Sequence, residues 1–308
     1  MVKNEHYIPK FYLERFSKNE KIYVYDLIND KIFPTNIRKV GSKNYFYDLD
    51  PKILKEILAE YKELTDISKE QYEELTNDVQ FVENALSRLE AKAGFYFNKF
   101  EEDYSLINDD GFLSILFLFM RTLSIRTMSF RAGLENIAEQ TTDWLNSLNI
   151  KEVSNYPLDM APKDIAKINQ LQELTSLART YDKSMKFFNN YNIYIGVNET
   201  DMDFLISDNP LVYFWLGFND ICFPINPKLS IIMQVKNVKK EFKICDFKPN
   251  ENGVIKLSEK EVIKYNILQH NTNARYLFGS EHMLKCHKEI IKLLNMINRI
   301  RKKEFRIE

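Results

Sequence analysis

The sequence predicts an α+β protein in which strands and helices occupy separate stretches of the chain. Short segments rich in β-branched and aromatic residues, set apart by turn residues, lie near both ends. Between them runs a long stretch rich in Leu, Glu, Lys and Ala with few Pro or Gly breaks, which is typical of helices. Runs of strands followed by runs of helices favour this class over a doubly wound parallel sheet.

We expect one compact domain over residues 1–308, with three sub-regions. Residues 1–50 hold a terminal segment and a small β-meander, with strands at KIYVYD, KIFPTNI and NYFYDL. Residues 51–191 are expected to form a central bundle of about four to six helices. Residues 192–308 are expected to form a mostly antiparallel sheet and two closing helices, at about 258–272 and 281–303, around a short RYLFGS strand. The strands of this sheet are expected at YNIYIGVN, DFLISD, LVYFWL, LSIIMQVK and EFKICDF.

Composition limits the class of function. Lys and Arg number 43 against 44 Asp and Glu, so the formal charge of −1 gives no global positive field for nucleic acid, although a local patch can still bind it. The three cysteines are far apart and indicate neither a disulfide framework nor a zinc site. The amino end lacks the apolar region of a secretory signal, and the longest apolar run, FLSILFLFM, is far short of the roughly 20 residues that cross a bilayer. We therefore expect a cytoplasmic protein with no membrane partner.

Two carboxylates lie at one border of an apolar stripe in the stretch VENALSRLEAKAGF. Glu83 and Glu90 are seven residues apart, so two helical turns bring both side chains to nearly the same direction. Such a pair at the edge of a buried face can act as acid and base or hold a cation. The alternative is a solvated helix edge that makes surface ion pairs.

Arginines interrupt an apolar helix in FLSILFLFMRTLSIRTMSFR. The first half of this segment is apolar on every side and should be buried, so a guanidinium that emerges from it needs an anionic partner. Of Arg121, Arg126 and Arg131, the strongest candidate is Arg126. Its partner is either Glu83 or Glu90 within the chain, or the phosphate or carboxylate of a ligand, which the guanidinium fork binds in a bidentate manner.

The turn in FLISDNPLVYF places Asp208 and Asn209 between two strands. An Asx turn explains Asp208 locally, whereas a functional interpretation makes it a loop carboxylate held at the mouth of the sheet. The basic end, residues 299–306, is interpreted as a helix C-terminus rather than an RNA contact. No P-loop, G-x-G-x-x-G, H-E-x-x-H or G-x-S-x-G motif is present, so the familiar nucleotide, zinc-protease and serine-hydrolase signatures are absent.

The chain resembles the bacterial family known as domain of unknown function 4238. The resemblance rests on HYIPKFYLERFS, VYD, NYFYDL, VENALSRLE, RTMSFR, SDNP and FPINP in this order, and runs from His6 to about Gly279. The family's opening pattern H-x-x-P-x-x-Y/F-L-x-x-F falls on His6, Pro9, Tyr12, Leu13 and Phe16. Its R-T-P-x-x-R falls on Arg126, Thr127 and Arg131, with Met128 in place of the usual proline. Proteins of this type have been placed among single-gene anti-phage defence genes, so the resemblance implies a role in stopping phage and names no reaction.

From these observations we expect a toxic effector, a nuclease acting on RNA or DNA. His6 would be the general acid or base, a carboxylate from Glu83, Glu90 or Asp208 would orient it or hold a divalent metal, and Arg126 would stabilise a phosphate. The residues expected to bind substrate are Lys10, Tyr12, Arg131 and Asn209. We assign no set of metal ligands. The whole site depends on the His6 imidazole and the Arg126 guanidinium sharing one pocket with acidic groups.

Two alternatives stay open. His6 could serve only to tie down the chain end through a hydrogen bond. The protein could also be a non-catalytic sensor that binds a phage protein or a small ligand and triggers toxicity by association. A homo-oligomer is compatible with both the nuclease and the sensor.

Overall fold

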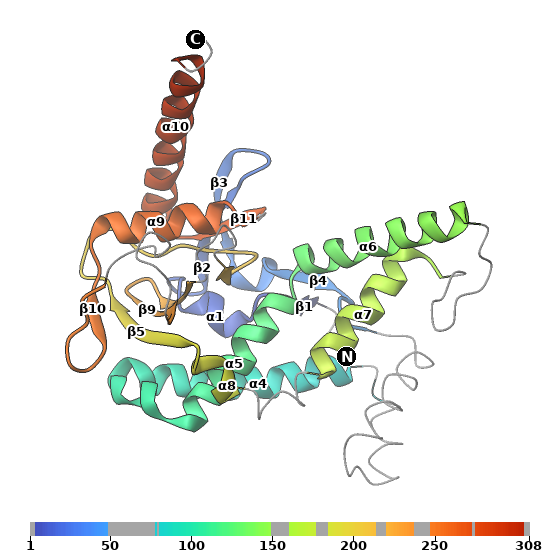
Figure 1. Cartoon of the computed structure of the whole chain (residues 1–308), viewed down its shortest axis with the longest axis horizontal. Helices are drawn as coiled ribbons and strands as arrows, with labels where there is room; N and C mark the ends of the chain where they lie inside the picture. The colour runs from blue at the N-terminus through green and yellow to red at the C-terminus, as the bar shows by residue number, and fades with distance from the viewer. Residues whose placement is uncertain are drawn as a thin grey trace. The chain divides into compact units, whose positions relative to one another are not determined.

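Figure 1 shows the computed structural model of the chain, which describes residues 4–48, 78, 80–148, 160–176, 184–213, 220–236, 247–272 and 275–304. The predicted α+β class is confirmed, with strands near both ends of the chain and helices in the middle. The internal contacts divide the chain into two compact units. Unit 1 comprises residues 1–9 and 41–187, and unit 2 comprises residues 10–40 and 188–308. That the whole chain acts as one domain stays a prediction.

Unit 1 is mainly helical. Its described helices are α4 (Phe81–Glu102), η2 (Tyr104–Asn108), α5 (Asp110–Ile125), α6 (Met128–Ser147) and α7 (Pro162–Ser176). Most of α5 is buried, as its apolar sequence predicts. In the described part of the chain, no single helix is long and apolar enough to cross a membrane, and α5 and α6 meet that test only as a pair bent by 54°.

The bend between α5 and α6 has a local cause. Arg126 ends α5, and the Thr127 hydroxyl caps α6 by accepting a hydrogen bond from the N–H of Phe130 at 3.1 Å. Because the chain leaves one helix and starts another within two residues, the Arg126 side chain lies at a break in the helical layer. Met128, at the first position of α6, does not prevent the bend.

A short two-stranded ladder fixes the amino end within unit 1. Here β1 (Asn4–His6) pairs antiparallel with β4 (Ser42–Asn44), so that Glu5 lies opposite Lys43. The N–H groups of Tyr7 and Ile8 both donate to the carbonyl of Gly41. Gly41 has a φ of +64°, and a Cβ there would approach Ile8 to 2.9 Å, so both conformation and space require glycine.

Two of the strand predictions at the amino end are corrected. The predicted strand NYFYDL is not a strand beyond Asn44: Phe46 and Tyr47 are buried in a turn that follows β4. The predicted hairpin consists of β2 (Lys21–Asp26) and β3 (Lys31–Asn36). The third strand of its sheet is β11 (Tyr276–Gly279), which pairs with β2. Both corrections involve partners far along the chain, which strand propensity does not specify.

Unit 2 holds two sheets. The first has the order β3-β2-β11-β6 and is antiparallel, with β6 at Ile206–Ser207. The second has the order β10-β5-β9-β8-β7 and is antiparallel except for the parallel pair of β10 and β5. Its strands are β5 (Tyr191–Val197), β7 (Val212–Tyr213), β8 (Ile221–Asn226), β9 (Leu229–Val235) and β10 (Val254–Lys256). The predicted strand EFKICDF lies almost wholly outside the described residues.

The helices of unit 2 frame these sheets. They are α1 (Lys10–Glu14), η1 (Ile37–Lys39), α9 (Glu259–His270) and α10 (Glu281–Glu304), with α8 (Ser184–Phe188) at the unit boundary. The two closing helices and the strand between them are confirmed, and α9 begins with the capping box of Ser258 and Glu261. Figure 1 shows α10 standing out from the rest of unit 2.

Candidate functional site

A buried arginine forms the centre of the candidate site in unit 1. Arg126 is 1% exposed, and each of its three side-chain nitrogens donates a hydrogen bond. Nε donates to the Tyr47 hydroxyl at 3.1 Å, one terminal nitrogen donates to the Glu90 carboxylate at 2.7 Å, and the other donates to the backbone carbonyl of His6. Burial lowers the pKa of Arg126, but Tyr47 and Glu90 raise it by more than burial lowers it, so the net pKa lies above its usual value.

The structure thus brings four of the expected residues together. Glu90 is the internal partner of Arg126, and Glu83 lies close enough for its charge to interact with Arg126. Burial raises the pKa of Glu83 above its usual value, and Glu90 and Asp48 add to the rise. His6 reaches Arg126 through its backbone carbonyl, which ties down the terminal strand. A role for the His6 imidazole stays a prediction.

The second arginine of the sequence motif supports the same region. Arg131 donates from Nε to the Gln170 side chain at 2.5 Å and from a terminal nitrogen to the carbonyl of Phe46 at 3.0 Å. Its guanidinium also lies 3.7 Å from the centre of the Phe46 ring. Burial lowers the pKa of Arg131 to about 10, so the group stays charged at neutral pH.

Two carboxylates that the sequence analysis missed complete the group. Glu5 is fully buried, and its Oε2 accepts a hydrogen bond from the N–H of Tyr47 at 2.6 Å. Asp48 follows Tyr47 and is half-buried. Burial raises the pKa of Glu5 to about 7, the Tyr47 N–H opposes this rise, and the neighbouring carboxyl groups of Asp48 and Glu83 add to it. We call Glu5, Asp48, Glu83 and Glu90 the acidic cluster.

The acidic cluster contains more acceptors than the described residues satisfy. Oε1 of Glu5, Oδ1 of Asp48 and Oε2 of Glu83 are buried and have no hydrogen-bond partner in the described part of the chain. A buried polar atom without a partner costs about 1 to 3 kcal/mol and calls for an explanation. Glu5 directly precedes His6, but nothing in the local sequence indicates that its side chain is buried.

A lysine that the sequence analysis did not single out borders the cluster. Lys167 on α7 is half-buried, and its Nζ donates to the carbonyl of Tyr45 at 3.2 Å. Burial and the neighbouring Arg131 lower the pKa of Lys167, whereas Asp48 and Glu5 raise it. The site therefore combines an acidic cluster with a partly exposed ammonium group.

The remaining expected residues belong to unit 2. Asp208 is 8% exposed, and its carboxylate accepts hydrogen bonds from the N–H groups of Arg275 at 3.0 Å and Tyr276 at 3.2 Å. Burial raises the pKa of Asp208 to about 6, and these backbone donors oppose the rise. Asn209 donates to the carbonyl of Thr272 at 2.9 Å. Both side chains join the turn after β6 to the chain around the start of β11. The local bond of the turn comes from Ser207 instead of an Asx bond of Asp208, because the Ser207 hydroxyl accepts the N–H of Asn209 at 3.1 Å.

Lys10 and Tyr12 make contacts within α1 and with its neighbours in unit 2. Lys10 forms ion pairs with Glu14 at 3.2 Å and Glu20 at 3.4 Å. Tyr12 is fully buried, donates to the carbonyl of Pro224 at 2.7 Å and stacks on Phe223. These contacts anchor α1 on β8, and substrate binding by the two residues stays a prediction.

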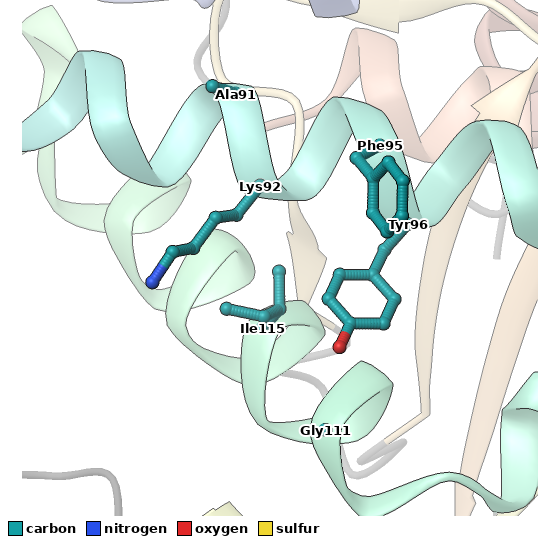
Figure 2. Close-up of a pocket in the computed structure, with 6 residues that line it drawn as sticks. All are labelled: Ala91, Lys92, Phe95, Tyr96, Gly111 and Ile115. Carbon is teal, nitrogen blue, oxygen red and sulfur yellow. The ribbon is translucent and has the colours of Figure 1, made fainter.

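An open hollow of about 560 Å³ lies between α4 and α5, lined by Ala91, Lys92, Phe95, Tyr96, Gly111 and Ile115. Figure 2 shows Lys92, Phe95 and Tyr96 extending from α4 above Ile115 and Gly111 of α5. At about 100° per residue, Lys92 and Phe95 point away from Glu83 and Glu90 on the helix surface. The hollow is therefore separate from the acidic cluster.

The described residues contain no group of three His, Cys, Asp or Glu side chains placed to hold a metal ion. The expected divalent metal thus has no ready set of protein ligands within that part of the chain.

Comparison with known proteins identifies the family of this chain and gives no individual relative. Neither the curated proteins nor the solved structures contain a match to this chain. The family model described as protein of unknown function (DUF4238) matches residues 4–283, and the chain therefore belongs to this family.

Proposed function

We propose that this protein is an anti-phage effector that hydrolyses phosphodiester bonds in RNA or DNA, with the acidic cluster of unit 1 as its active centre. The role in defence comes from the family resemblance described above. The observation that supports the enzymatic part is the acidic cluster, in which three carboxylates each keep a buried oxygen without a described partner. Carboxyl groups with perturbed pKa values in one place are typical of acid–base sites.

The contacts of Arg126 change the role expected for it. All three of its nitrogens already donate to groups of the protein, so we assign Arg126 to positioning Glu90 and the terminal strand rather than to binding phosphate. Lys167 is a better phosphate contact, because it is half-buried and an ammonium group has three donors, of which one reaches Tyr45. Arg131 supplies a second positive charge nearby.

The cluster divides the proton transfers of hydrolysis between two carboxyl groups. One carboxylate takes a proton from the attacking water, and a protonated carboxyl group donates a proton to the leaving oxygen. Glu83 suits the first role because it is partly exposed, and its raised pKa makes it a stronger base than an ordinary carboxylate.

The test is cleavage of single-stranded and duplex RNA and DNA by the purified protein, with and without Mg²⁺. We expect Glu83→Gln and Lys167→Ala to reduce the cleavage rate by about 100-fold or more, the range for loss of an acid–base or charge-stabilising group. Matched controls are Glu102→Gln on α4 and Lys163→Ala on α7, both exposed, which should cleave at the wild-type rate. Absence of cleavage by the wild-type protein on all four substrates would reject the nuclease.

A non-catalytic sensor is the second candidate, and one observation favours it. A network in which every nitrogen of Arg126 has an internal partner holds elements in place and needs no chemistry. Under this candidate, cells that carry Glu83→Gln would resist phage as well as wild-type cells do. Their RNA and DNA would stay intact on gels during infection.

A further inference from the structure

One side of α4 carries positive charges with aromatic rings between them. At about 100° per residue, the exposed residues Arg88, Lys92 and Lys99 fall within about 40° of one another around the helix axis. Phe95 and Tyr96 lie on the same side of the helix, between Lys92 and Lys99. We call these five residues the basic–aromatic stripe. The spacing brings positive charge and aromatic surface together on unit 1.

The two rings of the stripe are held in place. Phe95 is 56% exposed, its ring meets that of Tyr96 edge to face at 5.6 Å between centres, and the Lys99 ammonium lies 4.5 Å from its centre. The Tyr96 ring packs against Phe112 of α5 at 6.1 Å between centres. The Tyr96 hydroxyl lies over Gly111, where a Cβ would come within 3.1 Å of the oxygen. The rings therefore offer a fixed aromatic surface beside the hollow that they line.

The polar groups of the stripe have unused hydrogen-bonding capacity. Within the described residues, the side chains of Arg88 and Lys92 have no hydrogen-bond or ion-pair partner, and the Tyr96 hydroxyl has no hydrogen-bond partner. The acidic residue nearest to the stripe along α4 is Glu102, which follows Lys99 by three residues and so lies at the end of the stripe. The positive charges are therefore available to an anion in solution.

The hollow has the size and the chemistry of a site for one nucleotide. Its volume of about 560 Å³ lies within the range of about 300 to 1,000 Å³ found for small-ligand sites. Figure 2 shows Lys92 at one end, Tyr96 at the other and Ile115 of α5 between them. Asp109, near the Tyr96 end, caps α5 by accepting the N–H of Phe112 at 2.7 Å. An apolar floor with a cation at one end and a hydroxyl group at the other suits a flat base and its phosphate.

We infer that the basic–aromatic stripe binds single-stranded nucleic acid, with a base stacked on Phe95 and phosphates on Arg88, Lys92 and Lys99. Sites for single strands combine cations that follow the backbone with aromatic side chains on which bases stack. In a duplex the bases stack on one another, so it presents phosphates to the cations and no free base to the rings. The inference deepens the proposed function by naming single strands as the substrate class, and it rests on that function for the substrate role alone.

The direct test is fluorescence anisotropy of a short labelled DNA, as a single strand and as a duplex, with the full chain. Omission of Mg²⁺ and a range of salt concentrations separate binding from metal-dependent cleavage and measure the number of phosphate contacts. We expect the single strand to bind more tightly than the duplex. Phe95→Ala should weaken single-strand binding by about 5- to 150-fold, the range for one stacked base, and leave its salt dependence unchanged.

Lys92→Ala tests the phosphate contacts separately. It should weaken binding and lower the slope of log K against log salt by about 0.7, the value for one phosphate on a single strand. The matched controls are Trp144→Ala on α6, which is 60% exposed, and Lys163→Ala on α7, which is also exposed. Both should bind as the wild type does. All four substitutions change exposed residues, and circular dichroism verifies that each variant is folded.

Three results would overturn the inference. The first is a wild-type protein that does not bind the single strand. The second is equal affinity for single strand and duplex that Phe95→Ala leaves unchanged, because this result marks a surface for any polyanion. The third is Trp144→Ala weakening the binding as much as Phe95→Ala does, since the loss would then be unrelated to the stripe.

The substrate role has its own measurement, the kinetics of cleavage. We expect Phe95→Ala to raise KM for single strands and to leave kcat unchanged, because the stripe lies apart from the acidic cluster. An unchanged KM would reject the stripe as a substrate site while the nuclease stands. Single-strand binding by a protein that cleaves no nucleic acid would reject the nuclease while the stripe stands.

Discussion

Two sets of buried polar side chains, the amides of α9 in unit 2 and the acidic cluster in unit 1, differ in how fully their hydrogen bonds are satisfied. In unit 2, Asn266 accepts a hydrogen bond from the N–H of Leu205 at 2.8 Å and donates to the carbonyl of Asp203 at 2.9 Å. Gln269 of the same helix accepts from the Ser207 hydroxyl at 2.8 Å and donates to a backbone carbonyl. In unit 1, the acidic cluster leaves three buried carboxylate oxygens without described partners.

This difference separates structural polar groups from candidates for chemistry. A buried amide with both ends satisfied holds two elements in register, and its protonation never changes. A carboxyl group with an unsatisfied oxygen responds to a proton, a cation or a ligand, because each would relieve the same penalty. The comparison therefore directs functional experiments to unit 1 and stability experiments to both units.

The largest effect should come from removing the charge at the centre of unit 1. Arg126→Met leaves Glu90 and Tyr47 without their buried partner, and breaking a buried ion pair costs roughly 3 to 5 kcal/mol of unfolding free energy. Urea denaturation measures the loss, and hydrogen exchange assigns it to unit 1. Arg121→Met, exposed on the same helix, is the control and should change little. A loss below about 1 kcal/mol in Arg126→Met would show that the pair contributes little to the fold.

A smaller effect should come from a buried histidine of unit 2. His287 is 1% exposed, and its Nε2 lies 3.2 Å from Nδ1 of His270. Burial is the larger cause and the charge of His270 the smaller cause that together lower the pKa of His287 to about 4. Its folded pKa is below the unfolded value, so the stability it contributes is present above about pH 6.5 and is lost as the pH falls toward 4.

Between pH 7 and pH 4, we expect the unfolding free energy of His287→Gln to fall by roughly 1 to 3 kcal/mol less than that of the wild type. Urea denaturation at the two pH values measures this difference. His282→Gln, exposed on the same helix, is the matched control and should retain the wild-type slope. Equal slopes for all three proteins would show that His287 titrates alike in the folded and unfolded chain.

Glu5 should act in the opposite sense in unit 1, because its raised pKa stabilises the fold as the pH falls below about 7.

The smallest effect should come from an exposed ion pair of unit 2. Lys256 and Glu199 are 2.9 Å apart, close to the 2.7 Å of the Arg126–Glu90 pair, but their side chains are 77% and 60% exposed. Water and salt screen such a pair, so Lys256→Ala should leave the melting temperature unchanged within error. A clear drop in the melting temperature would show that distance, rather than burial, decides the strength of these pairs.

Much of the fold could be predicted from local pattern. The closing helices, the strand between them, and strands β5 and β9 lie close to where periodicity and side-chain type placed them. The strands β1 and β10 were missed because each is only three residues long and depends on a distant partner. The meander was wrong for the same reason, since its third strand comes from the other end of the chain.

The candidate site was only partly predictable. That Arg126 needs an anionic partner followed from its place in an apolar helix, and Glu90 was one of two partners considered. Glu5 and Asp48 carried no pattern of their own in the sequence. Each became part of the site through the ladder of β1 and β4 and the turn after it.

The sequence by itself determined the class of fold, the helical character of the middle of the chain, the two closing helices and the requirement for a counter-charge to Arg126. All of these follow from properties of short stretches of sequence, namely the periodicity of apolar residues and the free-energy cost of burying a charge. Only the tertiary structure decided which carboxylates meet. The contact that joins Glu5 to Tyr47 spans 42 residues, and no local preference specifies a pairing of that length.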